Sequence, residues 1–350
     1  MKSRNLLILL LVMSLVLVGG LSGCSQPSEE PSSGESDESS GETYEIRISH
    51  IASNTDPIHL GWEKFKETIE DKSDGRITVT ILGNKQISNS NDEDAEKVQS
   101  NTVQMSSVPT YTLAALGSID KYKLCDYPYL FKNDEEIYKI MDGEIGSELS
   151  QELIDKTGLK AYGAYSLGWV KISTNEKPIK APEDLAGLKI RTTNSDLYME
   201  LIKSWGANAT PVNYGELFTA LQQGTVEGMV TTTGLYVSDR FYEVQDFMAD
   251  VNPMAIVHVP VVNYEFYSSL PEDLQKVFDE TMEIYLEEVR ALEAKAEKDA
   301  IGQLREKGME VTELTDDQKQ VFMDAAAPIL VDKADLVGAD FIERIQNELK

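Results

Sequence analysis

The sequence is poor in cysteine and histidine, with Cys24 and Cys125 as its two cysteines and His50, His59 and His258 as its three histidines. With so few thiols, stability must come from burial of apolar side chains rather than from disulfides. The sequence has no CxxC pair and no HExxH motif, which argues against the common structural zinc sites and zinc proteases. We expect each histidine to be a core or surface residue and Cys125 to be a buried thiol.

Motifs for nucleotide binding and for acyl transfer are absent as well. The sequence contains no GxxxxGK[ST] loop and no GxSxG turn, which mark common nucleotide-binding proteins and hydrolases. Its 60 Asp and Glu residues make acidic pairs frequent by chance, so such pairs are no evidence of acid–base catalysis. We therefore expect no enzyme, no bound cofactor and no metal ion.

Positive charge is scarce, because 32 Lys and Arg residues stand against 60 Asp and Glu residues and the formal net charge is -28. This balance argues against nucleic acid and against an anionic lipid surface as direct partners. An anionic ligand would need a local cation that acts against the repulsive field of the whole protein. An isolated, well-placed arginine is therefore the residue to look for.

The N-terminal residues have the pattern of a lipoprotein signal peptide. Lys2 and Arg4 precede an apolar run over residues 6–18, and small residues come just before Cys24. The run is shorter than the about 20 residues of a membrane span. We predict that residues 1–23 are removed and that Cys24 is acylated, which holds the protein outside the cytoplasm on the membrane, in the periplasm or at the cell surface. The alternatives are an uncleaved anchor and an ordinary secretory signal.

The remaining chain divides into a tether and a body. Residues 24–43 are rich in Ser, Glu, Gly and Pro and read as a disordered, flexible tether. The body of about 300 residues exceeds what one hydrophobic core usually supports. We expect two lobes, the first made of residues 44–167 plus about 257–297 and the second of residues 168–256 plus about 298–350, in a monomer.

Within the body, short apolar runs alternate with amphipathic stretches, the pattern of βαβ units with a parallel sheet. One unbroken helix over residues 271–307 would be about 55 Å long and would lie along both lobes; two helices with an unmarked break are the alternative. The other expected elements are strands at 45–49, 77–82, 158–165, 188–192 and 226–230, and helices around 62–69, 92–99, 135–154, 195–205 and 214–223.

One segment places an arginine where a ligand is commonly bound. Residues 177–191 read KPIKAPEDLAGLKIR, in which Gly187 precedes a short strand that ends at Arg191. In open α/β sheets the carboxyl ends of strands face the ligand crevice. A guanidinium group can hold a carboxylate through two parallel hydrogen bonds. From the pattern alone, a structural surface arginine is as good an interpretation of Arg191 as a ligand-binding arginine.

This segment resembles the signature of the solute-binding proteins of tripartite ATP-independent periplasmic (TRAP) transporters, the dicarboxylate-binding DctP type of bacterial extracellular solute-binding protein family 7. The resemblance implies a two-lobed α/β fold like that of periplasmic binding proteins, with a long helix spanning both lobes. It also implies that a small organic acid is captured in the interlobe cleft and delivered to TRAP permease subunits in the membrane. Four further blocks are similar to the family's and occur in its order: residues 72–77 (KSDGRI), 126–131 (DYPYLF), 216–228 (ELFTALQQGTVEG) and 269–275 (SLPEDLQ).

The resemblance also assigns ligand-binding positions. It places Arg191 on the ligand carboxylate, with Asn194 as a polar neighbour and Tyr214 packed against the ligand. Thr231 stands where sialic-acid-binding relatives have asparagine. Core packing is the alternative role for Tyr214. From the first lobe, the resemblance places two short segments over the other side of the ligand, with Tyr111 and Thr112 in one and Ile51 and Asn54 in the other.

Departures from the family's pattern bear on the ligand. Many relatives have a second arginine at the position of Val170, next to Trp169, so one anion contact is lost here. Lys171 follows, but strand alternation points it to the opposite face. Together with Ile51 and Tyr214, Trp169 and Val170 indicate a less polar pocket, suited to a monocarboxylate with an apolar or aromatic body.

Three other functions remain open from the sequence. The protein could present its ligand to a membrane receptor as a sensor subunit, or serve an ATP-driven importer. An extracytoplasmic hydrolase is the third, and it needs a nucleophile that the sequence does not show. The genes beside this one would separate transport from sensing.

Overall fold

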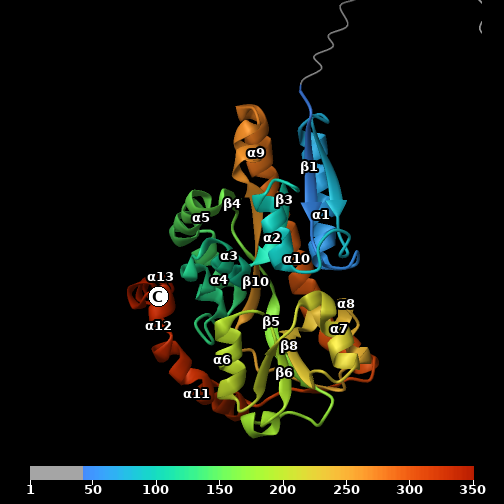
Figure 1. The fold of residues 1–350 in the computed structure, drawn as a ribbon, viewed down its shortest axis with the longest axis vertical. Helices are drawn as coiled ribbons and strands as arrows, with labels where there is room; N and C mark the ends of the chain where they lie inside the picture. The colour runs from blue at the N-terminus through green and yellow to red at the C-terminus, as the bar shows by residue number, and fades with distance from the viewer. Residues whose placement is uncertain (1–41) are drawn as a thin grey trace, which may run out of the picture. The chain divides into compact units, whose positions relative to one another are not determined.

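The computed structural model describes residues 42–350 (Figure 1). These residues begin with strands that are flanked by helices. The predicted signal peptide, Cys24 and nearly all of the predicted tether lie outside these residues. Among the described helices, none is both long and apolar enough to cross a membrane.

The first part of the sheet is parallel. Asp56 caps the N terminus of α1 (Pro57–Lys72), because its carboxylate accepts the Ile58 N–H at 3.0 Å. Trp62, Phe65 and Ile69 recur at helical spacing on α1 and are buried, as the sequence predicts. The strands of this part are β1 (Tyr44–Ser49), with β2 (Ile77–Leu82) on one side and β3 (Met105–Pro109) on the other; α2 (Asn91–Gln99) and α3 (Thr110–Gly117) flank β3 in the chain.

The second parallel part is built in the same way. Its register places Arg191 opposite Met229, so the side chains that follow these two residues by two positions lie on the same face. The strands are β6 (Lys189–Thr192), β7 (Asn208–Pro211) and β8 (Gly228–Thr232), and the helices are α6 (Asp196–Ser204), α7 (Tyr214–Gln222) and α8 (Thr233–Ser238).

Two long antiparallel strands join the parallel parts. Strand β10 (Ala255–Asn263) pairs with β3 and with β5 (Tyr165–Thr174), and β5 pairs with β8. The main path through the sheet is therefore β2-β1-β3-β10-β5-β8-β6-β7. The prediction of a parallel sheet is right for the outer parts and wrong in the middle. Short strands at its sides are β4 (Leu159–Ala161), β9 (Phe247–Ala249) and β11 (Glu310–Thr312).

The predicted helix over residues 135–154 is two helices in the structure, α4 (Asp134–Met141) and α5 (Glu144–Thr157). The chain turns at Gly143, and a Cβ at Gly146 would lie 1.8 Å from the Met141 carbonyl oxygen. Only glycine allows this close approach, so the helix breaks where its apolar pattern continues.

The long helix α10 (Glu272–Glu306) is unbroken over 35 residues, which confirms that prediction. It contacts α1 and β5 as well as α8 and β11, so it touches both parallel parts. On the α1 side, Trp62 stacks on Tyr285 with ring centroids 4.2 Å apart. Shorter helices complete the fold: α9 (Tyr264–Ser269), α11 (Asp316–Asp332), α12 (Ala334–Val337), α13 (Ala339–Glu348) and the 3-10 helices Asp120–Asp126, Pro182–Leu185 and Phe241–Glu243.

The C-terminal helix differs from the expected lobe assignment. Arg344 on α13 forms an ion pair with Glu148 on α5 at 2.7 Å, and Ile345 is buried in the same cluster as Leu149 and Leu153. Residues 339–348 thus pack on α5, within the range assigned to the first lobe, although we expected about 298–350 to belong to the second lobe.

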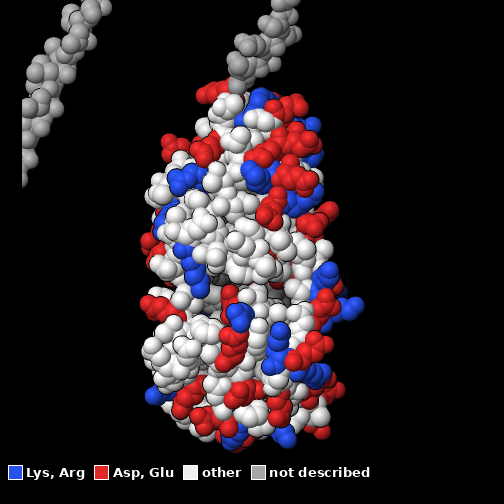
Figure 2. Space-filling view, turned by 90° about the vertical axis from the view of Figure 1, so that its right-hand side faces the viewer, with Lys and Arg blue, Asp and Glu red and all other residues white. Residues whose placement is uncertain are grey.

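Charged side chains are unevenly distributed over the face shown in Figure 2. Lys, Arg, Asp and Glu gather toward both ends of this face, and a band of uncharged residues crosses it between them. The charged residues are therefore not evenly distributed over this face of the protein.

Candidate functional site

A cavity lies where the strand ends of the two parallel parts meet the central strands. The first part contributes His50, Ile51, Ala52, Ile58, Asn91, Ser107 and Tyr111 to its wall. The central strands contribute Leu167, Ile256 and His258. The second part contributes Arg191, Thr193, Tyr214, Thr231, Leu235 and Asp239. The site is thus assembled from segments that are far apart in the sequence, as the resemblance implies.

Arg191 is buried in this wall without an acidic partner. Its residue is 3% exposed, and its Nε donates to the Val212 carbonyl oxygen at 3.0 Å. Among residues 42–350, no Asp or Glu forms an ion pair with it. Burial lowers the pKa of Arg191, but guanidinium groups stay protonated in proteins. The cavity therefore holds a positive charge that is not ion-paired with any carboxylate of the described residues.

Two hydroxyl groups lie beside this arginine. Thr193 follows Arg191 by two positions and Thr231 follows Met229 by two, so the β6–β8 register brings the two threonines to the same face as the guanidinium group. Both hydroxyls are buried and have no hydrogen-bond partner among the described residues. Hydroxyls in this state can donate to a bound carboxylate.

Tyr214 takes part in both the cavity and the core. It starts α7, its ring centroid lies 5.7 Å from the Arg191 guanidinium carbon, and it packs edge-on against Phe241. Its hydroxyl donates to Asp239, which lies just after α8. Burial raises the pKa of Asp239. Nothing in the sequence around Asp239 marked it as a cavity residue, because the tyrosine that fixes it lies 25 positions away.

Two of the three histidines line the cavity, although we expected each histidine to be a core or surface residue. His50 Nε2 lies 3.1 Å from His59 Nδ1, and His258 Nδ1 lies 3.3 Å from the Ser107 hydroxyl. Burial, with His59 nearby, lowers the pKa of His50 to about 4. Burial lowers the pKa of His258 to about 3. Both are therefore neutral at pH 7. The described residues contain no cluster of three or more His, Cys, Asp or Glu side chains placed for a metal ion.

Most of the residues predicted for the site lie at or beside the cavity. Arg191, Tyr214, Thr231, Tyr111 and Ile51 line it. Two more, Asn194 and Thr112, line an adjoining groove that shares Arg191, Tyr111 and Tyr214 with the cavity. The Thr112 hydroxyl donates to Asp92 at 2.8 Å.

Three predicted residues line neither the cavity nor the adjoining groove. Val170 is fully buried in the core, where its N–H donates to the Met254 carbonyl oxygen. The Trp169 indole N–H donates to Asp134 at 3.1 Å. Asn54 is exposed in the turn before α1. The apolar character that Val170 and Trp169 were expected to give the pocket comes instead from other residues.

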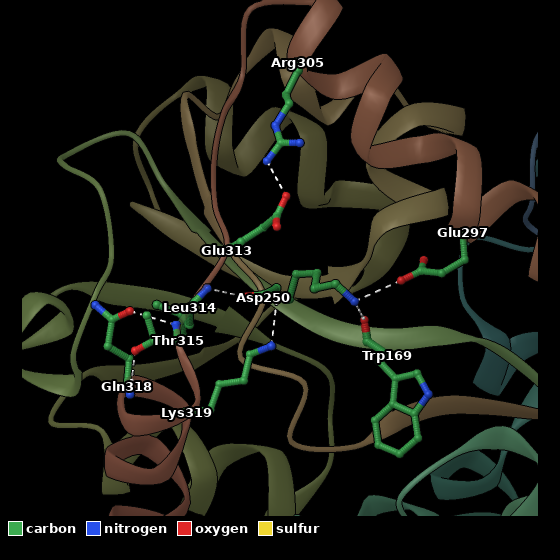
Figure 3. A network of polar contacts seen from close by, with 10 residues as sticks. Trp169, Asp250, Glu297, Arg305, Glu313, Leu314, Thr315, Gln318 and Lys319 are labelled. Carbon is green, nitrogen blue, oxygen red and sulfur yellow. Dashed lines mark hydrogen bonds and ion pairs between the residues drawn. The ribbon is translucent and has the colours of Figure 1, made fainter.

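Lys171 does not line the cavity, although the register places it opposite Thr231, on the same face of the sheet. Strand alternation therefore does not explain why it is absent from the cavity wall. Its Nζ donates to the Trp169 carbonyl oxygen at 2.8 Å and pairs with Glu297 of α10 at 2.9 Å. Figure 3 shows Glu297 reaching from its helix toward the strand that carries Trp169. Gly168 has φ +105, and a Cβ there would lie 2.6 Å from Glu297 Oε2, so this approach requires glycine.

Sequence comparison links the chain to solute-binding proteins. The family model for bacterial extracellular solute-binding protein, family 7 (DctP), matches residues 48–335. A Haemophilus influenzae relative, an uncharacterized protein, is 30% identical over 270 residues, which are 77% of this chain and 80% of the relative.

Solved structures are similar over nearly the whole described chain. A TRAP periplasmic solute binding protein from Sulfurospirillum deleyianum, with bound succinate, has a TM-score of 0.81 and 25% identity, covering 87% of this chain and 99% of its own. One from Polaromonas, bound to D-erythronate, has a TM-score of 0.81 and 28% identity, covering 87% and 98%. These similarities confirm the predicted two-lobed α/β fold.

Proposed function

Because the chain belongs to bacterial extracellular solute-binding protein family 7, and is therefore an extracytoplasmic binding protein rather than an enzyme, we propose that it captures a small organic acid at Arg191 and delivers it to TRAP permease subunits. One observation carries the assignment of the site. Arg191 is 3% exposed and has no acidic partner among residues 42–350. A buried cation without a partner is costly, and a ligand carboxylate removes that cost.

Capture depends on closure of two lobes. We assign residues 44–167 plus about 257–297 to the first lobe and residues 168–256 plus about 298–350 to the second, with α13 packed on the first. The ligand carboxylate docks on Arg191 with help from Thr193 and Thr231, and the first lobe then covers it with Tyr111 and Ile51. Closure removes both charges from water, which strengthens their attraction. The ligand favours the closed form only as far as it binds that form better.

Calorimetry on the purified full chain tests the role of Arg191. Titration with succinate, D-erythronate and butanoate samples acids with one and two carboxylates. Arg191→Ala should weaken the best of them by about 2 kcal/mol or more, the cost of leaving a buried charge unpaired. Lys189→Ala is the matched control, since Lys189 lies on the same strand and is exposed. Equal affinities for both variants would reject the site.

Delivery to a TRAP permease rests on the family and on the similar TRAP structures. Uptake of the bound acid by cells that make this chain should stop when ionophores collapse the ion gradients while ATP is maintained. Uptake that continues under these conditions would favour an ATP-driven importer instead.

Anchoring rests on the sequence before Cys24. We propose that Cys24 carries lipid, which keeps the body at the membrane. Cys24→Ser should move the protein from the membrane fraction to the soluble extracytoplasmic fraction, and mass spectrometry of the N-terminal peptide should lose the acyl chains. An unmodified Cys24 in the wild type would refute the anchor.

A further inference from the structure

We infer that this protein binds monocarboxylates with a short aliphatic body, because the cavity wall has one cation and several aliphatic residues. It would then discriminate against C4-dicarboxylates such as the succinate bound to a structural relative. The inference rests on the proposed function, because it takes Arg191 as the carboxylate site.

The cavity wall carries a single full positive charge. Arg191 is the one Lys or Arg among the lining residues, and Asp239 is the one Asp or Glu. His50 and His258 are neutral at pH 7, because burial lowers the pKa of His50 to about 4 and that of His258 to about 3. With its first carboxylate on Arg191, a dicarboxylate would bring its second into a wall that offers no further cation and one acidic side chain, Asp239. That second carboxylate would be desolvated without compensation.

Two other lysines close to cavity residues do not line the cavity. Lys171 is held by Glu297 and by the Trp169 carbonyl oxygen. Lys85 is exposed, with its Nζ 5.9 Å from the Tyr214 ring centroid, and it does not line the cavity. Burial raises the pKa of Asp239, and the Tyr214 hydrogen bond and the charge of Lys85 lower it by less.

Of the other twelve wall residues, six are polar or aromatic: Asn91, Ser107, Tyr111, Thr193, Tyr214 and Thr231. The remaining six are aliphatic: Ile51, Ala52, Ile58, Leu167, Leu235 and Ile256. Five of them come from the first part and the central strands, whereas Arg191, Thr193 and Thr231 come from the ends of β6 and β8. A ligand held by its carboxylate on the second part would therefore meet these aliphatic side chains on the side that closes, beside the polar groups of His50, Asn91, Ser107 and Tyr111. Burial of apolar ligand surface there is favourable, whereas a charged end is not.

A matched pair of probes tests this selectivity by calorimetry on the full chain. Butanoate and succinate have the same carbon backbone, and succinate differs in carrying a carboxylate where butanoate has a methyl group. We expect butanoate to bind at least tenfold more tightly than succinate at pH 7. Branching should help, so 3-methylbutanoate should bind at least as tightly as butanoate.

Two variants locate the cause. Asp239→Asn removes the like charge while keeping the shape of the side chain, and should narrow the ratio of succinate to butanoate dissociation constants at least threefold. Lys85→Ala should leave that ratio within twofold of the wild type. A large loss of succinate affinity in Lys85→Ala would mean that Lys85 serves as the second cation, which overturns the inference.

The outcomes separate this inference from the proposed function. Succinate binding as tightly as butanoate, with both lost in Arg191→Ala, would overturn the monocarboxylate inference and leave the carboxylate site intact. Binding of either acid that does not depend on Arg191 would overturn the site itself, and the inference with it.

Discussion

Two buried cations on strands that both neighbour β8 have opposite surroundings. Lys171 on β5 is 4% exposed and is paired with Glu297. Arg191 on β6 is 3% exposed and has no acidic partner among the described residues. The positive charge of Lys171 is ion-paired within the chain, whereas Arg191 forms an ion pair only when an anionic ligand binds. The difference distinguishes a structural ion pair from a binding site more sharply than burial alone does.

The histidines of the cavity show a third way to bury a base. His50 and His258 give up the proton, as their lowered pKa values show. Arginine cannot do this, because its guanidinium group stays charged. The same cavity wall thus holds two neutral imidazoles, His50 and His258, and one guanidinium group, Arg191, that stays charged.

The largest effect should come from breaking the internal pair. Lys171→Met leaves Glu297 without its cation, and we expect urea unfolding to show a loss of about 3 kcal/mol, the lower end for a broken buried pair, because the Glu297 side chain is 25% exposed. Adding Glu297→Gln should restore part of it. Arg191→Met should cost less than about 0.5 kcal/mol, since it removes an unbalanced charge. Equal losses for Lys171→Met and Arg191→Met would erase the distinction between the two regions.

Ligand should stabilise only the region that lacks an internal partner. Butanoate at 100 times its dissociation constant should raise the free energy of unfolding of the wild type by about 2.7 kcal/mol, seen as a higher Tm. Lys171→Met should keep this gain above its own lower baseline. Arg191→Ala at the same butanoate concentration should show almost none, and a full response in that variant would contradict the comparison.

The smallest effect is that of a moderate drop in pH, to 5.5. A histidine whose pKa is lowered on folding contributes stability that is fully present above about 6.5 and is lost progressively as the pH falls from there to its folded value, here about 3 for His258. At pH 5.5 the loss for one such histidine is about 1.4 kcal/mol. His258→Gln should flatten the stability profile between pH 6.5 and 4, whereas Arg191→Met should leave its slope unchanged. A wild-type profile that is already flat there would show that His258 is protonated in the folded protein.

Much of the fold follows from local sequence. The strand at 45–49, the helix around 62–69 and the strand at 77–82 have clear periodicity, and the structure has all three. Strand β10 has none, because all nine of its residues are buried. Its pairing on both sides, rather than its own pattern, makes it a strand.

The site was predictable where one segment carries the signal. Arg191 lies next to the last residue of a short strand inside a recognisable block, so its place in the cavity could be expected. Asp239 and the hydroxyl of Thr193 could not, because tertiary contacts and the β6–β8 register bring them there. Val170 was expected in the pocket from a family position, but its side chain is buried in the core of this chain.

Helix α10 makes the molecule sensitive to length as well as to composition. Its 35 residues keep Tyr285 against Trp62 and Glu297 against Lys171 on one continuous backbone. One residue inserted between these two contacts would turn the downstream part about 100° around the axis and shift it about 1.5 Å along it. The ring stack and the ion pair could not then both form. The number of residues between Tyr285 and Glu297 is therefore fixed by the two contacts, whichever residues occupy the positions between them.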